Sequence, residues 1–370
     1  MIKAVFITNI PSPYRVDFFA YMQKNFPEYE FHIIFSGAGM ENRKWSVELQ
    51  ELEHYTFLKS KTLIIRKRFD DRYVFIPTGV EKALNEIKPD VVFAMEYNPT
   101  ILKAVHWCQK KKIPFISWTD GTLNSEKNIG KVQRMSRSYI IKRAAAFVAS
   151  STASKQTQIA YGADEKKCFI SYLTVDINKY LREKSDYSGK QLLYVGSLIQ
   201  RKGIDLLLPA LAKTSDDIRL VLVGEGQEKE LLEKQAEELG ISSRIEFKGY
   251  VEGEPLRELY NSSDVFILPT REDCFGLVIL EAMCASLPVI SSKYADGAFD
   301  LVNEGENGHI VDPEDEDAFA KAIEDIFADE GRLYEMGQKS YVKAHEFAFS
   351  EVAKGCIESL EYVQEHVLKK

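Results

Sequence analysis

The stretch Arg271–Met283 reads R-E-D-C-F-G-L-V-I-L-E-A-M, and it indicates how the chain folds. It follows an apolar run, residues 264–270, that is typical of a buried parallel strand. A short acidic loop then leads through a Phe-Gly step into a helix-like segment. The first turn of a helix presents unpaired backbone N–H groups and a partial positive charge, and Gly276 allows a ligand to approach the backbone closely. The stretch therefore predicts a strand–loop–helix unit that holds an anionic phosphoester.

Two acids flank the expected phosphate position. Glu281 lies five residues beyond Gly276, which is about 7–8 Å along a helix axis. From there its carboxylate reaches a sugar hydroxyl while the phosphates sit at the helix tip. Asp273, before the helix, reaches a second sugar on the other side of the phosphates. For this segment alone, the alternative is an ordinary strand–loop–helix unit with a solvated acidic turn.

The two acids resemble the E-x7-E signature of family 4 retaining glycosyltransferases of the GT-B fold. Asp273, or by a one-residue offset Glu272, stands for the first acid, and Glu281 stands for the second. The resemblance implies an α/β protein with two Rossmann-like domains, whose parallel sheets face a cleft between the domains. It also implies metal-independent transfer of a sugar from a nucleotide diphosphate sugar, with a UDP-sugar as the expected donor. Four consecutive residues would then line the phosphates: Phe275, Gly276, Leu277 and Val278.

Strand-like and helix-like segments alternate along the whole chain. Apolar runs such as Ala4–Thr8 and Val91–Ala94 in the first half, and Arg219–Val223 in the second, are separated by longer amphipathic segments. This alternation indicates parallel sheets covered on both faces. It predicts a first domain at 1–180, a polar linker at 181–190 and a second domain at 191–349. The resemblance implies that the first domain binds the acceptor, that the second binds the nucleotide sugar, and that a C-terminal helix at 350–370 packs back on the first.

Composition excludes several classes of protein. The chain of 370 residues is 45% hydrophobic and 28% charged, and no apolar run approaches the roughly 20 residues that a bilayer span needs. Its N-terminus lacks the cleavage site of a secretory signal. The five cysteines are scattered and the six histidines show no metal spacing, so we expect a cytoplasmic protein without disulfides or structural zinc.

Charge is distributed unevenly along the chain. Residues 1–185 hold 29 Lys and Arg against 19 Asp and Glu, a balance of +10, whereas residues 186–370 hold 19 against 37, a balance of −18. Lys127–Arg143 is a basic amphipathic segment, and Lys59–Arg72 adds a second basic cluster. Such segments favour peripheral contact with an anionic membrane or a phosphate-bearing lipid. The alternatives are uneven solvated charge and a domain helix with its apolar face in the core.

The expected second domain opens with Y-V-G-S-L-I-Q-R-K-G, residues Tyr194–Gly203. Arg201 and Lys202 beside a glycine turn suit a diphosphate, because Arg offers a bidentate fork and Lys a compact charge. The segment is similar to the family pattern G-R-x-x-x-x-K-G: Lys202 matches its lysine, whereas Ser197 stands where arginine is commonest. Further donor-side positions implied by the resemblance are Gly196, Ser197, Glu225, Tyr250 and Val251.

The first domain carries candidates for the acceptor side. Tyr14 and Arg15 follow a proline-stiffened loop, N-I-P-S-P, for which a rigid surface turn is the alternative. Asp120 ends a strand where relatives commonly carry a histidine near the reacting sugar, and Glu96 ends the preceding one. Each carboxylate either contacts substrate or caps a helix.

The resemblance implies that Lys202, Arg201, Asp273, Glu281 and Asp120 serve transfer to a glycan or polyprenyl-diphosphate-linked acceptor in cell-surface polysaccharide synthesis. The alternatives are another GT-B enzyme, such as a sugar-nucleotide epimerase or a phosphorylase, and a non-catalytic sugar-nucleotide-binding protein. A dehydrogenase is disfavoured because no G-x-G-x-x-G follows the first strand. We expect no nucleic-acid partner. The acidic run 315–317 formally resembles a metal motif, but its place at a helix start favours capping, and we expect neither a metal nor another cofactor.

Overall fold

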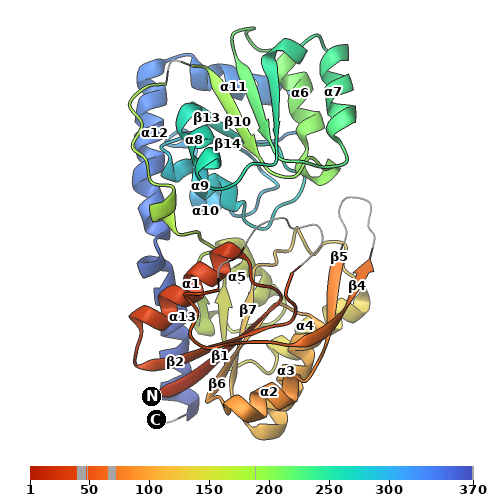
Figure 1. Ribbon diagram of the computed structural model, residues 1–370, viewed down its shortest axis with the longest axis vertical. Coiled ribbons are helices and arrows are strands. Elements are labelled where there is room, and N and C mark those ends of the chain that lie inside the picture. The colour runs from red at the N-terminus through yellow and green to blue at the C-terminus, as the bar shows by residue number, and fades with distance from the viewer. Residues whose placement is uncertain (40–46, 48, 66–71, 188, 369–370) are drawn as a thin grey trace. The chain divides into compact units, whose positions relative to one another are not determined.

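The computed structural model describes residues 1–39, 47, 49–65, 72–187 and 189–368. The chain divides into two compact units (Figure 1). The first unit comprises Met1–Asp176 and Phe349–Lys370, and the second comprises Ile177–Ala348. Residues 181–190, the expected linker, belong to the second unit.

The first unit is built on a parallel sheet with the strand order β3-β2-β1-β6-β7-β8-β9. Its strands are β1 (Ile2–Thr8), β2 (Tyr29–Phe35), β3 (Tyr55–Phe57), β6 (Val91–Met95), β7 (Phe115–Thr119), β8 (Ala146–Ala149) and β9 (Cys168–Ile170). Its helices are α1 (Pro13–Asn25), α2 (Val80–Ile87), α3 (Pro99–Lys111), α4 (Lys131–Ile141), α5 (Thr152–Ala160) and α13 (Phe349–Val363). An antiparallel hairpin, β4 (Lys59–Ile65) and β5 (Arg72–Thr78), lies outside this sheet. The strand order reverses between β1 and β6, which is where open α/β sheets form a ligand crevice.

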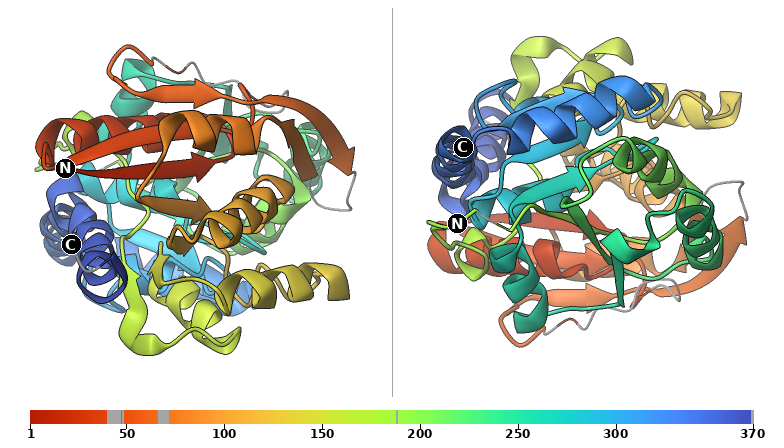
Figure 2. Two further views of the ribbon diagram at one scale, coloured as in Figure 1. Left: turned by 90° about the horizontal axis from the view of Figure 1, so that it is seen from below. Right: turned by 90° about the horizontal axis from the view of Figure 1, so that it is seen from above.

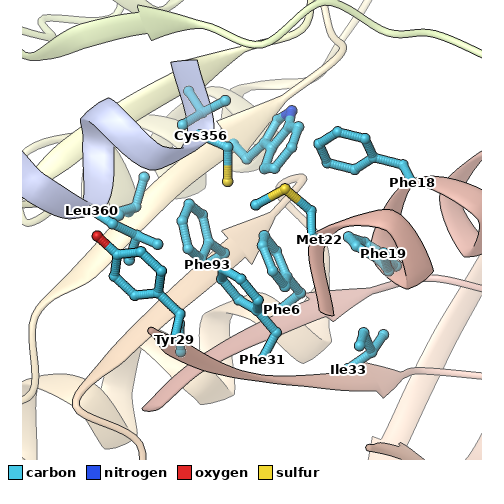
Figure 3. Packing of buried hydrophobic residues seen from close by; sticks show 14 of the residues in the cluster. Phe6, Phe18, Phe19, Met22, Tyr29, Phe31, Ile33, Phe93, Cys356 and Leu360 are labelled. Carbon is cyan, nitrogen blue, oxygen red and sulfur yellow. The ribbon is translucent and has the colours of Figure 1, made fainter. Parts of the chain in front are cut away.

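Aromatic side chains fill the core on one face of this sheet (Figure 3). The rings of Phe6 and Phe93 stack with their centroids 4.4 Å apart, and Phe19 lies 4.9 Å from Phe6. Cys356 and Leu360 of α13 belong to the same cluster, so the last helix completes the core of the first unit. A glycine lets α13 come close to β9, because a Cβ atom at Gly355 would lie 1.9 Å from the carbonyl oxygen of Ile170.

The second unit has a parallel sheet with the order β12-β11-β10-β13-β14-β15. Its strands are β10 (Gln191–Val195), β11 (Arg219–Val223), β12 (Ile245–Gly249), β13 (Val265–Leu268), β14 (Val289–Ser292) and β15 (Gly308–Val311). Its helices are α6 (Ile204–Ala212), α7 (Lys229–Glu238), α8 (Glu254–Ser262), α9 (Leu277–Cys284), α10 (Ala298–Leu301), α11 (Glu316–Phe327) and α12 (Glu330–Ala344). This is the strand order of a Rossmann domain, and its switch point lies between β10 and β13. The predicted α/β fold with parallel sheets is confirmed in both units.

Candidate functional site

Two loops meet at the switch point of the second sheet. The loop after β10 and the loop after β13 are joined by the N–H of Arg271, which donates to the carbonyl oxygen of Arg201 at 2.8 Å. Gly203 adopts a φ of 71° beside Pro269, whose carbonyl oxygen would lie 2.1 Å from a Cβ atom at that position. A glycine is therefore needed there for both conformation and space. The close packing fixes Arg201 and Lys202 against the segment 271–283.

Lys202 and Asp273 form an ion pair inside this loop contact. The Nζ atom of Lys202 lies 2.5 Å from Oδ2 of Asp273, and Oδ1 of Asp273 accepts from the backbone N–H groups of Phe275 and Gly276 at 3.2 and 3.0 Å. Burial opposes the charge of Asp273, but Lys202, Arg201 and the N–H of Phe275 together lower its pKa to about 2. Asp273 is thus an ionised carboxylate with a fixed orientation.

Helix α9 begins directly after this carboxylate. Gly276 precedes the helix with a φ of 82°, a left-handed conformation that favours glycine. The N–H groups of Leu277 and Val278 open the helix, where no earlier turn supplies an acceptor. These two groups and the side chains of Arg201 and Lys202 make this edge of the second unit suited to an anion.

Arg271 and Asp205 also fix the loop, and sequence reasoning missed them. The Nη1 and Nη2 atoms of Arg271 donate to the two carboxylate oxygens of Asp205, each at 2.7 Å, and Nη1 also donates to the carbonyl oxygen of Gln200 at 2.7 Å. Arg201 is held in turn by Glu272, whose carbonyl oxygen accepts from its Nη1 at 2.8 Å. A signal was present, because Asp205 stands in the first turn of α6 beside the basic pair.

Glu281 points into a pair of phenol groups. The hydroxyl of Tyr260, a fully buried residue, donates to Oε2 of Glu281 at 2.7 Å. Burial raises the pKa of Glu281 to about 7, although hydrogen bonds from Tyr260 and Tyr180 act to lower it. Sequence reasoning missed both tyrosines, which stand 21 and 101 positions before Glu281 and carry no local signal.

The remaining donor-side candidates lie on neighbouring loops of the same edge. The N–H of Gly196 donates to the carbonyl oxygen of Val223 at 2.9 Å, and the N–H of Leu198 donates to that of Glu225 at 2.9 Å, so the loops after β10 and β11 run side by side. Ser197 and Glu225 have exposed side chains in these loops.

Tyr250 and Val251 follow β12. The N–H of Gly224 donates to the carbonyl oxygen of Gly249 at 2.8 Å, which joins their loop to the one after β11. Tyr250 is exposed, and its hydroxyl donates to Oε2 of Glu252 at 2.6 Å. The structure therefore brings all the donor-side candidates to the carboxyl edge of one sheet.

In the first unit, Arg15 and Asp120 form a pair at the carboxyl ends of the strands. The Nη2 atom of Arg15 lies 2.6 and 2.9 Å from the two carboxylate oxygens of Asp120. The hydroxyl of Ser150 also donates to Asp120, and the guanidinium of Arg15 stacks over Trp118 and Tyr14, 5.1 and 5.6 Å from the ring centroids. Arg15 is buried, so its guanidinium is placed to hold the carboxylate of Asp120 in one orientation.

Glu96 lies beside Asp120 in a strained backbone conformation. Its φ is 71°, and its Oε1 accepts from the N–H of Asp120 at 2.9 Å. Burial and the charge of Asp120 raise the pKa of Glu96 to about 7. Left-handed backbone at a residue other than glycine is concentrated at functional sites. The Nδ2 atom of Asn98 donates to Oδ1 of Asn9 at 2.8 Å, which ties the loops after β6 and β1 across the switch point.

The basic segment Lys127–Arg143 divides between core and surface. Arg137 was expected on a cationic face, but it is buried and its Nε lies 2.7 Å from both carboxylate oxygens of Glu126. The expectation was wrong for Arg137 because Glu126 compensates its charge inside the unit. The other cations of the segment are exposed: Lys127, Lys131, Arg134, Lys142 and Arg143. Of the second basic cluster, Lys59–Arg72, residues 66–71 lie outside the described residues.

The acidic run 315–317 caps a helix. Oδ1 of Asp315 accepts from the N–H of Ala318 at 3.0 Å at the start of α11, as a capping residue does. Among the residues that the structure describes, no cluster of His, Cys, Asp or Glu side chains is arranged to hold a metal ion. In the described part of the chain, no helix has the length and apolar composition needed to cross a bilayer.

Sequence comparison finds similarity to known proteins in the part of the chain that holds the donor-side candidates. A family model described as "Glycosyl transferases group 1" matches residues 179–343, which all lie in the second unit. The nucleotide-sugar candidates fall within this match. An uncharacterized glycosyltransferase of Methanocaldococcus jannaschii is 31% identical over 190 residues, 48% of each chain. The lipopolysaccharide core biosynthesis glycosyltransferase LpsE of Rhizobium meliloti is 35% identical over 154 residues, 41% of this chain and 44% of LpsE. The aligned region thus spans about half the length of these relatives.

Solved structures extend the similarity to both units. HepE of Anabaena in complex with UDP superposes with a TM-score of 0.78 at 18% identity, over 98% of this chain and all of HepE. The apo form of the lipopolysaccharide outer core galactosyltransferase WaaB superposes with a TM-score of 0.76 at 19% identity, over 97% of this chain and 99% of WaaB. The predicted GT-B fold is confirmed.

Proposed function

We propose that this protein is a retaining, metal-independent glycosyltransferase of family 4. Its donor is a nucleotide diphosphate sugar, with UDP as the carrier, and its acceptor is a glycan or a polyprenyl-diphosphate-linked sugar in cell-surface polysaccharide synthesis. The observation that carries this proposal is the loop contact at the start of α9, where Arg201 is held by the carbonyl oxygen of Glu272 and Lys202 pairs with Asp273. Glu281 lies further along the same helix. The role of LpsE in lipopolysaccharide core biosynthesis supports the acceptor class, and the UDP complex of HepE supports the carrier.

The proposed roles of the cationic side chains follow from the negative charge that develops on the leaving diphosphate. In transfer from a nucleotide sugar, the leaving diphosphate gains negative charge, and preorganised donors stabilise it. Lys202, Arg201 and the N–H groups of Leu277 and Val278 would supply those donors. Lys202 would then share its charge between Asp273 and the diphosphate. Such charge-assisted hydrogen bonds are stronger than neutral ones.

The carboxylates would hold sugar hydroxyls. Asp273 stays ionised and is oriented by its backbone partners, so its remaining lone pairs can accept from the donor sugar. Glu281 would accept from the ribose. On the acceptor side, Asp120 would orient the attacking hydroxyl, and Arg15 and Glu96 would position Asp120. As the family resemblance implies, the diphosphate would assist removal of the acceptor proton on the same face of the sugar.

Calorimetric titration with UDP tests the donor site. Lys202→Ala and Glu281→Ala should each weaken binding by about 1.5–3 kcal/mol, the range for hydrogen bonds to charged groups. Lys213→Ala is the matched control, because this exposed lysine of the same unit pairs with Glu316 and Asp317. Unchanged affinity in both site variants would refute the assignment.

Metal independence has its own test. Transfer in excess chelator should keep most of its rate, because cationic side chains and helix N–H groups are proposed to take the role of a divalent ion at the diphosphate. Loss of activity that magnesium or manganese restores would contradict this part of the proposal.

We further propose that α4 meets an anionic membrane, where a lipid-linked acceptor is presented. Val132 and Met135 are 79% and 70% exposed and are flanked by the exposed cations Lys131 and Arg134. Each cation near an anionic surface contributes about 1 kcal/mol. Changing both cations to Glu should reduce co-sedimentation with anionic vesicles at low salt. Binding that is equal for anionic and neutral vesicles would favour an acceptor in solution.

A further inference from the structure

The chain from β3 into β4 exposes its odd-numbered side chains along the whole length, and from Lys61 to Ile65 it exposes the even-numbered ones as well. Successive residues of an extended chain point to opposite sides, and here the odd-numbered positions face solvent while Leu58 is buried. We call these positions the exposed row: Tyr55, Phe57, Lys59, Lys61, Leu63 and Ile65. Its apolar members are between 38% and 50% exposed. On the neighbouring strand β5, Ile76 pairs with Lys61 and is 45% exposed, which widens the row.

The opposite face of the hairpin is anchored to the first unit. Phe75 is buried, and its ring lies 2.6 Å from the position that a Cβ atom on Gly37 would take. The Nζ atom of Lys103 in α3 donates to the carbonyl oxygen of Pro77 at 2.7 Å. The fold therefore holds the face that carries Phe75, although Thr62 and Ile64 on that face are exposed. The exposed row lies on the other face.

The order of residues along the row suits a lipid interface. Two aromatic residues come first, two lysines follow, and two aliphatic residues lie at the C-terminal end of β4. Aromatic rings and lysines prefer the headgroup region, and aliphatic side chains gain by entering the acyl region. A dry protein interface suits the row less well, because burying Lys59 and Lys61 without acidic partners is costly. Pairing the row with a second copy would bring the lysines of both copies into one interface.

We propose that the exposed row is a second lipid-contact element, which places Leu63 and Ile65 in the surface of an anionic bilayer while Lys59 and Lys61 pair with its headgroups. The hairpin and α4 project toward the same side of the first unit in the views of Figures 1 and 2. The two elements can therefore engage one membrane surface together. The inference deepens the proposed membrane contact and rests on it for its purpose, but lipid binding can be measured without any turnover.

The test is co-sedimentation of the full chain with vesicles of phosphatidylcholine, with and without 30% phosphatidylglycerol. The double variant Leu63→Ser/Ile65→Ser should lower partitioning onto anionic vesicles about tenfold, because two half-exposed aliphatic side chains no longer gain from burial. Lys59→Glu/Lys61→Glu should lower it at least as much on anionic vesicles and leave partitioning onto neutral vesicles unchanged. Ile64→Ser is the matched control, because Ile64 is 40% exposed on the same strand but points to the other side.

Three outcomes would overturn the inference. They are full partitioning of the Leu63→Ser/Ile65→Ser variant, an equal loss in Ile64→Ser, and a dimer in analytical ultracentrifugation that the double variant abolishes while the vesicles bind neither protein. Each variant should keep the UDP affinity and the circular dichroism spectrum of the wild type, which checks that the fold is intact. If the transferase proposal fails while the vesicle results hold, the row remains a lipid contact. If only the α4 variant loses binding, the row is excluded.

Discussion

Replacing Glu281 by glutamine should make the protein more stable above neutral pH, although it removes a proposed ligand group. Burial raises the pKa of Glu281 from its ordinary value of 4.5 to about 7. Below pH 4.5 the carboxyl is protonated in both the folded and the unfolded chain, so its titration does not change the free energy of unfolding there. Between these two values the unfolded chain loses the proton first, so stability falls as the pH rises.

The size of the effect follows from the same two values. A pKa difference of one corresponds to about 1.4 kcal/mol, so Glu281 costs the folded state about 3 kcal/mol above pH 7. The neutral amide of Glu281→Gln has no such charge, and its oxygen still accepts from Tyr260. The variant should match the wild type near pH 4.5 and exceed it by up to about 3 kcal/mol at pH 8, while its affinity for UDP falls. Glu96 titrates in both proteins and cancels in the difference.

Hydrogen exchange in α9 and β13 at pH 5 and pH 8, corrected for the intrinsic rates, measures this difference within the second unit. Glu237→Gln, a change of an exposed glutamate in α7, is the control and should leave the exchange free energies unaltered. If Glu281→Gln is no more stable than the wild type at pH 8, burial of a charged Glu281 is not costly and the reasoning fails. The predicted combination, a gain in stability with a loss of ligand affinity, is typical of functional sites.

Three further tests concern the loop contact at Gly203, the buried ion pair of Arg137 and the hydroxyl of Tyr260. Gly203→Ala and Gly240→Ala both place a side chain at a φ of 71°, but only at Gly203 does a neighbouring carbonyl oxygen lie 2.1 Å from the new Cβ atom. Denaturant unfolding should show a loss of about 1 kcal/mol in stability for Gly240→Ala and a clearly larger loss for Gly203→Ala. Equal losses would contradict the close loop contact. Arg137→Met leaves the buried carboxylate of Glu126 without its cationic partner, although the Tyr161 hydroxyl still donates to it. The change should cost about 3–5 kcal/mol in denaturant unfolding, of which a second change, Glu126→Gln, should restore a part. Tyr260→Phe removes one donor to the proposed ribose carboxylate and should weaken UDP by about 1 kcal/mol in calorimetry, with the loss shrinking below pH 6; a loss independent of pH would argue against an effect through that carboxylate.

Local patterns in the sequence predicted the sheets well. The apolar run at 264–270 contains β13, and the helix-like segment after Gly276 is α9. Continuous apolar strands between amphipathic helices have few other solutions than a parallel α/β fold. The candidate residues Gly196, Gly276, Arg201 and Lys202 also lie at one edge of the second sheet, because the carboxyl ends of parallel strands share it.

Contacts between distant positions could not be predicted. Arg15 and Asp120 are 105 positions apart, and Tyr260 reaches Glu281 across 21, so neither partner marks the other in the sequence. The buried pair of Arg137 and Glu126 shows a second limit, because a cation on an amphipathic helix looks the same whether water or a carboxylate compensates it. The hairpin β4–β5 was missed because its exposed face mixes lysine with aliphatic residues, which departs from the usual alternation of apolar and polar positions.

The return of α13 to the first unit has a consequence for how the chain is made. The five side chains that this helix places in the core are Val352, Ala353, Cys356, Leu360 and Val363. On the ribosome they emerge only after the whole second unit, Ile177–Ala348, has been synthesised. The second unit is a continuous segment and can fold as it leaves the exit tunnel. The nascent first unit must wait, with part of its aromatic core open to water, until the last helix is released.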